Sequence, residues 1–217
     1  MFAIIAVAHD PKAKRRNFNI KKALDVVIND VNQQYHLDFQ QPFQVVGSNE
    51  IHGVLSKGIY VLEICDRLSY LLDNYDLTFG IGFVEHRENR QKSIERGFVL
   101  AKSALKRLAA DDDYGNNKIH VNLGRRNSLE NIVNESLRLA DFVGSRWRQS
   151  QRDLIKYLIL TYGYMEKFVQ KDVAKAMKVS AQNLNQQLKN SGYYNLIRLK
   201  REVTIILEQY RRTYYKN

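Results

Sequence analysis

Short apolar runs alternate with segments of helical periodicity along the first 125 residues. Five runs are expected to form β-strands, at residues 2–8, 43–47, 51–55, 77–84 and 119–123. Three intervening segments have apolar residues every three or four positions and are expected to form helices, at residues 20–31, 61–72 and 98–108. The order βαββαβαβ predicts an α+β fold, in which helices cover one face of a mostly antiparallel, ferredoxin-like sandwich.

Two small features refine this picture. Ser48 and Asn49 separate the second and third predicted strands, which indicates a hairpin. Gly80 and Gly82 lie within the fourth predicted strand. Because glycine has no side chain, this strand can approach another backbone segment closely.

The second half of the chain is expected to be helical throughout. Residues 127–143 predict an amphipathic helix that links the two halves, and the polar stretch after Gly124 indicates a domain boundary. Residues 145–162 and 194–214 predict two further helices. We therefore expect an α+β domain over residues 1–125, a linking helix over 126–144 and an all-α domain over 145–217.

Residues 170–189 have the pattern of a helix-turn-helix, the DNA-binding motif of many bacterial regulators. Val173, Ala174 and Met177 fit one face of a short helix, and Leu184 and Leu188 fit one face of a second. Between the helices, Lys178 occupies a turn position where such motifs often have glycine. Ser180 is expected to cap the second helix through its hydroxyl.

Charge is concentrated in the same half of the chain. Residues 126–217 contain 17 Lys/Arg and 8 Asp/Glu, a balance of +9, whereas residues 1–125 contain 17 and 15, a balance of +2. Negatively charged phosphates attract such an excess of positive charge, so the charge balance favours a nucleic-acid partner. We expect Gln182, Asn183 and Gln186 to read base edges, while lysines contact the backbone of double-stranded DNA. The expected phosphate contacts are Lys171, Lys175, Lys178 and Lys189.

The last predicted helix offers two alternatives. Leu199, Val203, Ile206 and Tyr210 have nearly heptad spacing, which suits either a homodimer or packing within the chain. A homodimer would match a two-fold-symmetric DNA site. The opposite face is expected to carry a row of basic side chains, namely Arg198, Lys200, Arg201, Arg211 and Arg212.

Composition narrows the functional classes. A single cysteine, Cys65, excludes an intrachain disulfide and suits a reducing, cytoplasmic environment. The sequence has no apolar run long enough to span a membrane and no signal-peptide pattern, so no membrane partner is expected. The histidines show no metal-site spacing, and we expect no metal or other cofactor.

Several motifs, in this order, resemble the SatD-like bacterial proteins over nearly the whole chain. They are the opening strand, SNEIHGVL at 48–55, LTFGIGFVE at 77–85 and the C-terminal helix-turn-helix. Members of that family typically have GDEFQGLL where this chain has SNEIHGVL. The resemblance implies an N-terminal domain that is distantly similar to the palm-like fold of class III nucleotide cyclases and diguanylate cyclases.

In the cyclase palm, two carboxylates hold divalent metal ions. Here Asn49 stands at the hairpin position of one such carboxylate, and an amide is a poorer Mg²⁺ ligand because it brings no charge. Asp10 and Glu50 remain as a shifted, vestigial pair, although Glu50 is expected to point away from Asn49. We therefore expect a domain that is not an enzyme and that dimerises or senses a small-molecule or nucleotide ligand.

Three functional hypotheses follow. The first is a DNA-binding transcriptional regulator. The second is a divergent metal-dependent nucleotidyl cyclase, and the third is a protein-interaction module whose basic helices meet an acidic partner.

Overall fold

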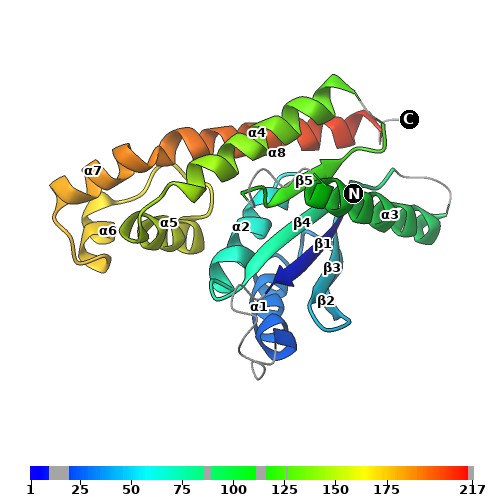
Figure 1. Ribbon diagram of the computed structural model, residues 1–217, viewed down its shortest axis with the longest axis horizontal. Helices are drawn as coiled ribbons and strands as arrows, with labels where there is room; N and C mark the ends of the chain where they lie inside the picture. The colour runs from blue at the N-terminus through cyan, green and yellow to red at the C-terminus, as the bar shows by residue number, and fades with distance from the viewer. Residues whose placement is uncertain (10–19, 86–88, 111–115, 126, 215–217) are drawn as a thin grey trace.

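A five-stranded mixed sheet forms the centre of the first half of the chain (Figure 1). The computed structural model describes residues 1–9, 20–85, 89–110, 116–125 and 127–214. The strand order is β2-β3-β1-β4-β5, and every neighbouring pair is antiparallel except β4 and β5, which are parallel. The strands are β1 (Phe2–His9), β2 (Phe39–Val46), β3 (Glu50–Leu55), β4 (Asp76–Phe83) and β5 (Ile119–Asn122).

The α+β class predicted from the sequence is confirmed, but the helices cover both faces of the sheet. α1 (Ile20–Gln34) and α2 (Val61–Leu71) pack in the larger core with the side chains of Phe2 and Ile4. α3 (Arg90–Ala110) packs on the opposite face, where Ile94 meets Ala3 and Val54. The prediction of helices on one face was therefore wrong, because a central strand buried on both sides does not reveal which face each helix covers.

The two strand glycines explain how α3 lies so close to the sheet. A Cβ atom at Gly80 would lie 2.1 Å from the carbonyl oxygen of Ala101, and one at Gly82 would lie 2.1 Å from the carbonyl oxygen of Gly97. Both oxygens belong to the α3 backbone, which cannot move aside alone. The predicted close approach at β4 is thus confirmed, and α3 is the segment that approaches.

The second half consists of helices that continue the larger core. In Figure 1, α4 and α8 run side by side over the sheet, while α5, α6 and α7 gather at the end of the molecule farthest from β2. Buried residues of these helices belong to the same apolar cluster as the sheet. The helices are α4 (Ser128–Ser145), α5 (Gln149–Tyr162), α6 (Gln170–Ala176), α7 (Ala181–Ser191) and α8 (Tyr193–Thr213).

A buried ion pair ties α8 to α2. Lys200 Nζ lies 2.7 Å from both carboxylate oxygens of Asp66, and Tyr164 donates its hydroxyl to the same carboxylate at 2.6 Å. The side chains of Lys200 and Asp66 are only 7% and 12% exposed. Lys200 was predicted to lie on an exposed basic face, and this prediction was wrong because its carboxylate partner lies 134 residues away in the chain.

None of the helices in the described part of the chain is both long and apolar enough to cross a membrane.

Candidate nucleic-acid interface

α6 and α7 are two short helices joined by a tight turn at residues 177–180. Their contact is made by apolar side chains that the sequence pattern identified. Val173 and Ala174 are buried on α6, and Leu184 and Leu188 are buried on α7. α7 also packs against α5, which supplies further buried residues to the core. The predicted inner faces of both helices are therefore confirmed.

The turn depends on two residues with special backbone roles. Lys178 has a φ of 55°, in the left-handed region where glycine is usual. The hydroxyl of Ser180 accepts a hydrogen bond from the backbone N–H of Asn183 at 3.1 Å, which confirms the predicted cap of α7. This bond satisfies one of the N–H groups that the first helical turn leaves unpaired.

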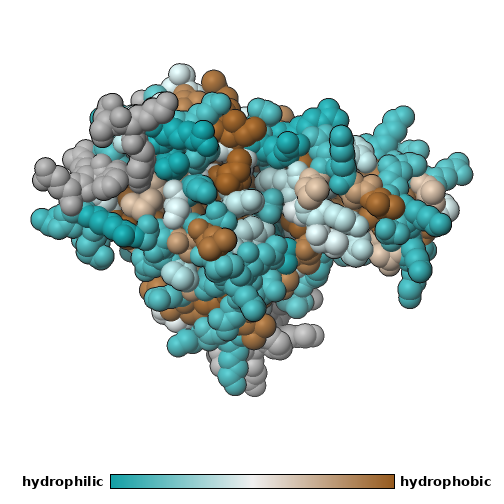
Figure 2. Space-filling model, turned by 180° about the vertical axis from the view of Figure 1, so that it is seen from behind, coloured by the Kyte–Doolittle hydropathy of each residue, from teal (hydrophilic) through white to brown (hydrophobic). Residues whose placement is uncertain are grey.

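The seven residues predicted to contact bases or phosphates are exposed, and so is Ser180, which the sequence also assigned to the DNA-binding surface. Gln182, Gln186 and Lys189 lie three and four positions apart on α7 and therefore share one side of the helix. Asn183 lies on a neighbouring side, where its carbonyl oxygen accepts a hydrogen bond from Gln187 at 3.1 Å. α7 thus presents amides and a cation outward. The end of the molecule that carries α6 and α7 lies at the right of Figure 2, where the surface is mostly hydrophilic.

The four lysines of this surface form no ion pair within the described residues. We call Lys171, Lys175, Lys178 and Lys189 the α6–α7 lysines. Asp172 is the acidic residue in the first turn of α6. The positive charge of the α6–α7 lysines therefore faces solvent, where a polyanion can approach it.

The arginines of α8 have a different environment. Arg198 and Arg201 hold the two carboxylate oxygens of Glu166, at 2.9 and 2.8 Å. Arg211 and Arg212 bond Glu208. The sequence predicted an open basic face here, but these charges are paired within the chain. Periodicity could not reveal the pairing of Arg198 and Arg201, because Glu166 lies in a loop outside the helix. Glu208, in contrast, lies on α8 itself, three and four positions before Arg211 and Arg212.

Glu208 accepts hydrogen bonds from both arginines at the end of α8. Burial alone would raise the pKa of its carboxyl group. Hydrogen bonds from Arg211, the Gly58 backbone N–H and Arg212 outweigh burial and lower that pKa to about 2. Glu208 therefore stays ionised and fixes the C-terminal turns of α8 to the loop before α2.

Further contacts hold the α6–α7 unit against the rest of the protein. The indole Nε1 of Trp147 donates to the carbonyl oxygen of Ser191 at 2.9 Å, at the end of α7. Gly192 follows in the left-handed region and lets the chain enter α8 at once. Tyr193 is fully buried and donates its hydroxyl to Met165 at 3.2 Å. The orientation of α7 is therefore fixed at its C-terminal end.

The heptad-like seam of α8 is used within the chain. Val203 and Tyr210 are buried, and α8 packs along α4 and against α7. These two seam residues are therefore used in packing within the chain, whereas Leu199 and Ile206 are half-buried.

The second predicted site lies at the hairpin between β2 and β3. Asn49 Nδ2 donates to the carbonyl oxygen of Ala8 at 2.9 Å, so its amide joins the hairpin to the end of β1. Glu50 Oε2 lies 3.0 Å from His52 Nε2, and the His52 ring stacks on Phe98 of α3. Asp10 lies outside the described residues. Within those residues, no group of three His, Cys, Asp or Glu side chains is placed to hold a metal ion.

Comparison with known proteins identifies the family. The model of the SatD family matches residues 1–207, which include the sheet, α4 to α7 and most of α8. The chain belongs to the SatD family, as its motifs indicated. No curated protein and no solved structure matches it.

Proposed function

We propose that this SatD-family chain binds double-stranded DNA and regulates transcription. In this proposal α5, α6 and α7 form a helix-turn-helix, and α7 enters the major groove. The observation that carries it is the contrast between two sets of basic residues. The arginines of α8 are paired with carboxylates, whereas the α6–α7 lysines surround an amide-rich helix and have no ion-pair partner among the described residues.

The chemistry of α7 supports this role. Glutamine and asparagine side chains can bond the N6 and N7 atoms of adenine in the major groove, and lysines bind phosphates without sequence preference. Gln182 and Asn183 lie in the first turn of α7, where recognition helices contact bases. The left-handed turn at Lys178 also supports the motif, since it lets α7 leave α6 abruptly.

For the first half, we infer a ferredoxin-like, palm-related domain that senses or dimerises. Supporting this, β1 lies between β3 and β4, and the first four strands are antiparallel in the order expected from two interleaved βαβ units. Such a domain could present α7 twice to a symmetric DNA site. Val203 and Tyr210 of the α8 seam would take no part in pairing two copies, because both are buried within the chain.

The proposal is tested by fluorescence anisotropy with a random-sequence duplex at about 50 and about 200 mM salt. We expect binding that weakens steeply with salt. The double variant Lys175→Gln/Lys189→Gln should bind every sequence less tightly, and the slope of log K against log salt should fall by about 2. Absence of binding by the intact protein at the lower salt would refute the proposal.

A matched control separates specific contacts from total charge. Lys102 and Lys106 are exposed lysines four positions apart on α3, on the far side of the sheet from the larger core. Lys102→Gln/Lys106→Gln removes the same charge and should leave affinity nearly unchanged. Equal losses in the two double variants would show that net charge, and not the α6–α7 surface, attracts the DNA.

The residues expected to contact base edges are tested after a preferred DNA site has been selected from a library of random sequences. Gln182→Ala or Asn183→Ala should reduce discrimination by about 1–3 kcal/mol at the base pair that each side chain contacts, and should hardly change binding to random DNA. A uniform loss across all sequences would assign these residues to backbone contact.

A further inference from the structure

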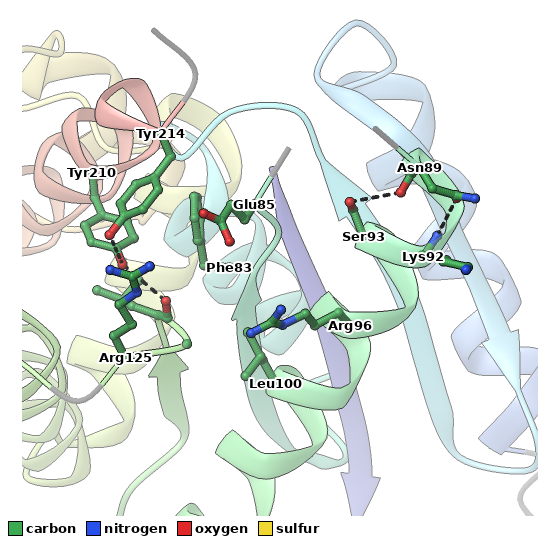
Figure 3. A pocket seen from close by; sticks show the side chains of 12 residues that line it. Phe83, Glu85, Asn89, Lys92, Ser93, Arg96, Leu100, Arg125, Tyr210 and Tyr214 are labelled. Atoms are coloured by element: carbon green, nitrogen blue, oxygen red, sulfur yellow. Dashed lines mark hydrogen bonds between the residues drawn. The ribbon is translucent and has the colours of Figure 1, made fainter. Parts of the chain in front are cut away.

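A cavity of about 720 Å³ lies between α3, the end of β4 and the C-terminal end of α8 (Figure 3). Its size is within the range of small-molecule sites in proteins. It lies at the end of the two inner strands β1 and β4 where Phe2 pairs with Phe83. Asn49 and Glu50 lie at the other end of β1, where Glu50 pairs with Val7. The cavity is therefore separate from the carboxylate site that the sequence suggested.

One wall of the cavity is formed by aromatic rings. The rings of Phe83 and Tyr210 lie 4.9 Å apart between centroids, and those of Phe83 and Tyr214 lie 5.4 Å apart. Tyr210 donates its hydroxyl to the backbone carbonyl of Leu123 at 3.2 Å, which fixes its ring. Aromatic rings arranged in this way provide faces and edges against which a flat, apolar group can pack.

Three cations are among the residues that line the same cavity. Lys92 and Arg96 are four positions apart on α3 and lie on the same side of that helix, while Arg125 comes from the segment after β5. None of the three forms an ion pair within the described part of the chain. The guanidinium carbon of Arg125 lies 6.0 Å from the centre of the Tyr214 ring. Glu85 is the carboxylate among the lining residues, and it has an interaction partner of its own.

We propose that this cavity binds a small organic anion in which a flat aromatic ring carries a phosphate, carboxylate or sulfonate group. The ring lies against Phe83, Tyr210 and Tyr214, and the anionic group meets Lys92, Arg96 and Arg125. Among the described lining residues, three cations against one carboxylate leave an excess of positive charge, and anions attract arginine and lysine through charge-assisted hydrogen bonds. The inference does not depend on whether α7 binds DNA.

Two fluorescent probes test the proposal because they differ mainly in charge. Anilinonaphthalene sulfonate has a flat ring system and a sulfonate, and phenylnaphthylamine has the same ring system without it. We expect the intact protein to bind the sulfonate at least about tenfold more tightly, as a charged group near three cations should. Equal affinity for the two probes, or binding of neither, overturns the proposal.

Variants then locate the probe. Lys92→Gln/Arg96→Gln should weaken binding of the sulfonate about tenfold and leave binding of the neutral probe within about twofold. Lys102→Gln/Lys106→Gln is the matched control, because it removes two cations at the same spacing on the same helix, outside the cavity lining. An equal loss in both double variants would place the probe elsewhere.

A third variant tests the aromatic wall. Tyr214 is half-buried at the end of α8, so Tyr214→Ala removes a ring face with little disturbance of the core. It should weaken both probes by a similar factor. Unchanged affinity for both would remove ring recognition from the proposal and so refute it. Circular dichroism of each variant shows whether the fold is retained.

Discussion

Replacing Lys200 by methionine should strongly destabilise the junction between α8 and α2. Methionine keeps the length and apolar stem of lysine but removes the ammonium group that lies 2.7 Å from both oxygens of Asp66. Asp66 would keep its hydrogen bond from Tyr164 and lose its only ion-pair partner among the described residues. A buried carboxylate would then be left without a counter-charge.

The magnitude follows from the burial of the pair. With side-chain exposures of 7% and 12%, little water reaches either charge, so loss of one partner should cost about 3–5 kcal/mol. For a chain of this size, that lowers the melting temperature by roughly 6–20 °C. Exposed pairs behave differently. Lys156 and Asp73 form an ion pair with side chains 35% and 52% exposed, and Lys156→Met should cost only about 0–1 kcal/mol.

Asp141 adds a dependence on pH. Burial raises the pKa of its carboxyl group to about 6, against the lowering effects of Lys200 and of a hydrogen bond from the Lys118 backbone N–H. A carboxyl with a raised folded pKa favours the folded state at low pH, and this contribution is lost as pH rises through that pKa. Without Lys200 the pKa rises further. The cost of Lys200→Met should therefore be smaller at pH 5 than at pH 8.

Urea unfolding followed by circular dichroism measures these costs at both pH values. The double variant Asp66→Asn/Lys200→Met should recover much of the loss, because asparagine can still accept the Tyr164 hydrogen bond and carries no buried charge. A cost below about 1 kcal/mol for Lys200→Met would contradict a dry, buried pair. So would a double variant no more stable than Lys200→Met alone.

Three further predictions concern single positions. Gly82→Ala should lower the free energy of unfolding, measured in urea, by about 3 kcal/mol, because its Cβ would lie 2.1 Å from the Gly97 carbonyl oxygen. Gly144→Ala in α4 is the control and should not destabilise the protein, because the nearest atom to its Cβ lies at 3.8 Å. Lys178→Gly should raise the free energy of unfolding by about 0.5–1 kcal/mol, because it relieves the strain of a φ of 55°. It should also weaken DNA binding. A lower free energy of unfolding would show that the turn is unstrained. Glu208→Gln should lower the free energy of unfolding most at neutral pH and least near pH 2. The lowered pKa of Glu208 stabilises the fold above about pH 4.5, and that contribution disappears as the pH falls through about 2. A loss of stability that does not depend on pH would contradict this.

The positions of most helices and strands could be predicted from the sequence. The observed β1 covers residues 2–9 against an expected 2–8, and α4 begins at Ser128 against an expected 127. α3 begins at Arg90, before the expected start at 98, because Ile94 and Gly97 pack on the sheet within a largely polar stretch. Periodicity detects such elements because the repeat of a helix or strand is set by neighbours within a few residues.

Some features of the candidate interface could also be predicted, because they depend only on residues close together in the sequence. The Ser180 cap joins atoms three residues apart, and the buried Leu184 and Leu188 lie on one side of a single helix. The exposure of Gln182 and Lys189 followed from the same pattern. Each of these features needs only the periodicity of one helix and the polarity of its residues.

Only the tertiary structure decided which charges remain free. The sequence placed Lys200 and Arg198 on one basic face, but Asp66 and Glu166 neutralise them from distant segments. The side of the sheet that α3 covers, and the cavity that it forms with the end of α8, depend in the same way on long-range packing. Local periodicity indicates that a residue faces inward or outward, whereas the partner it meets is set by how distant elements pack together, and that information is not contained in any one segment.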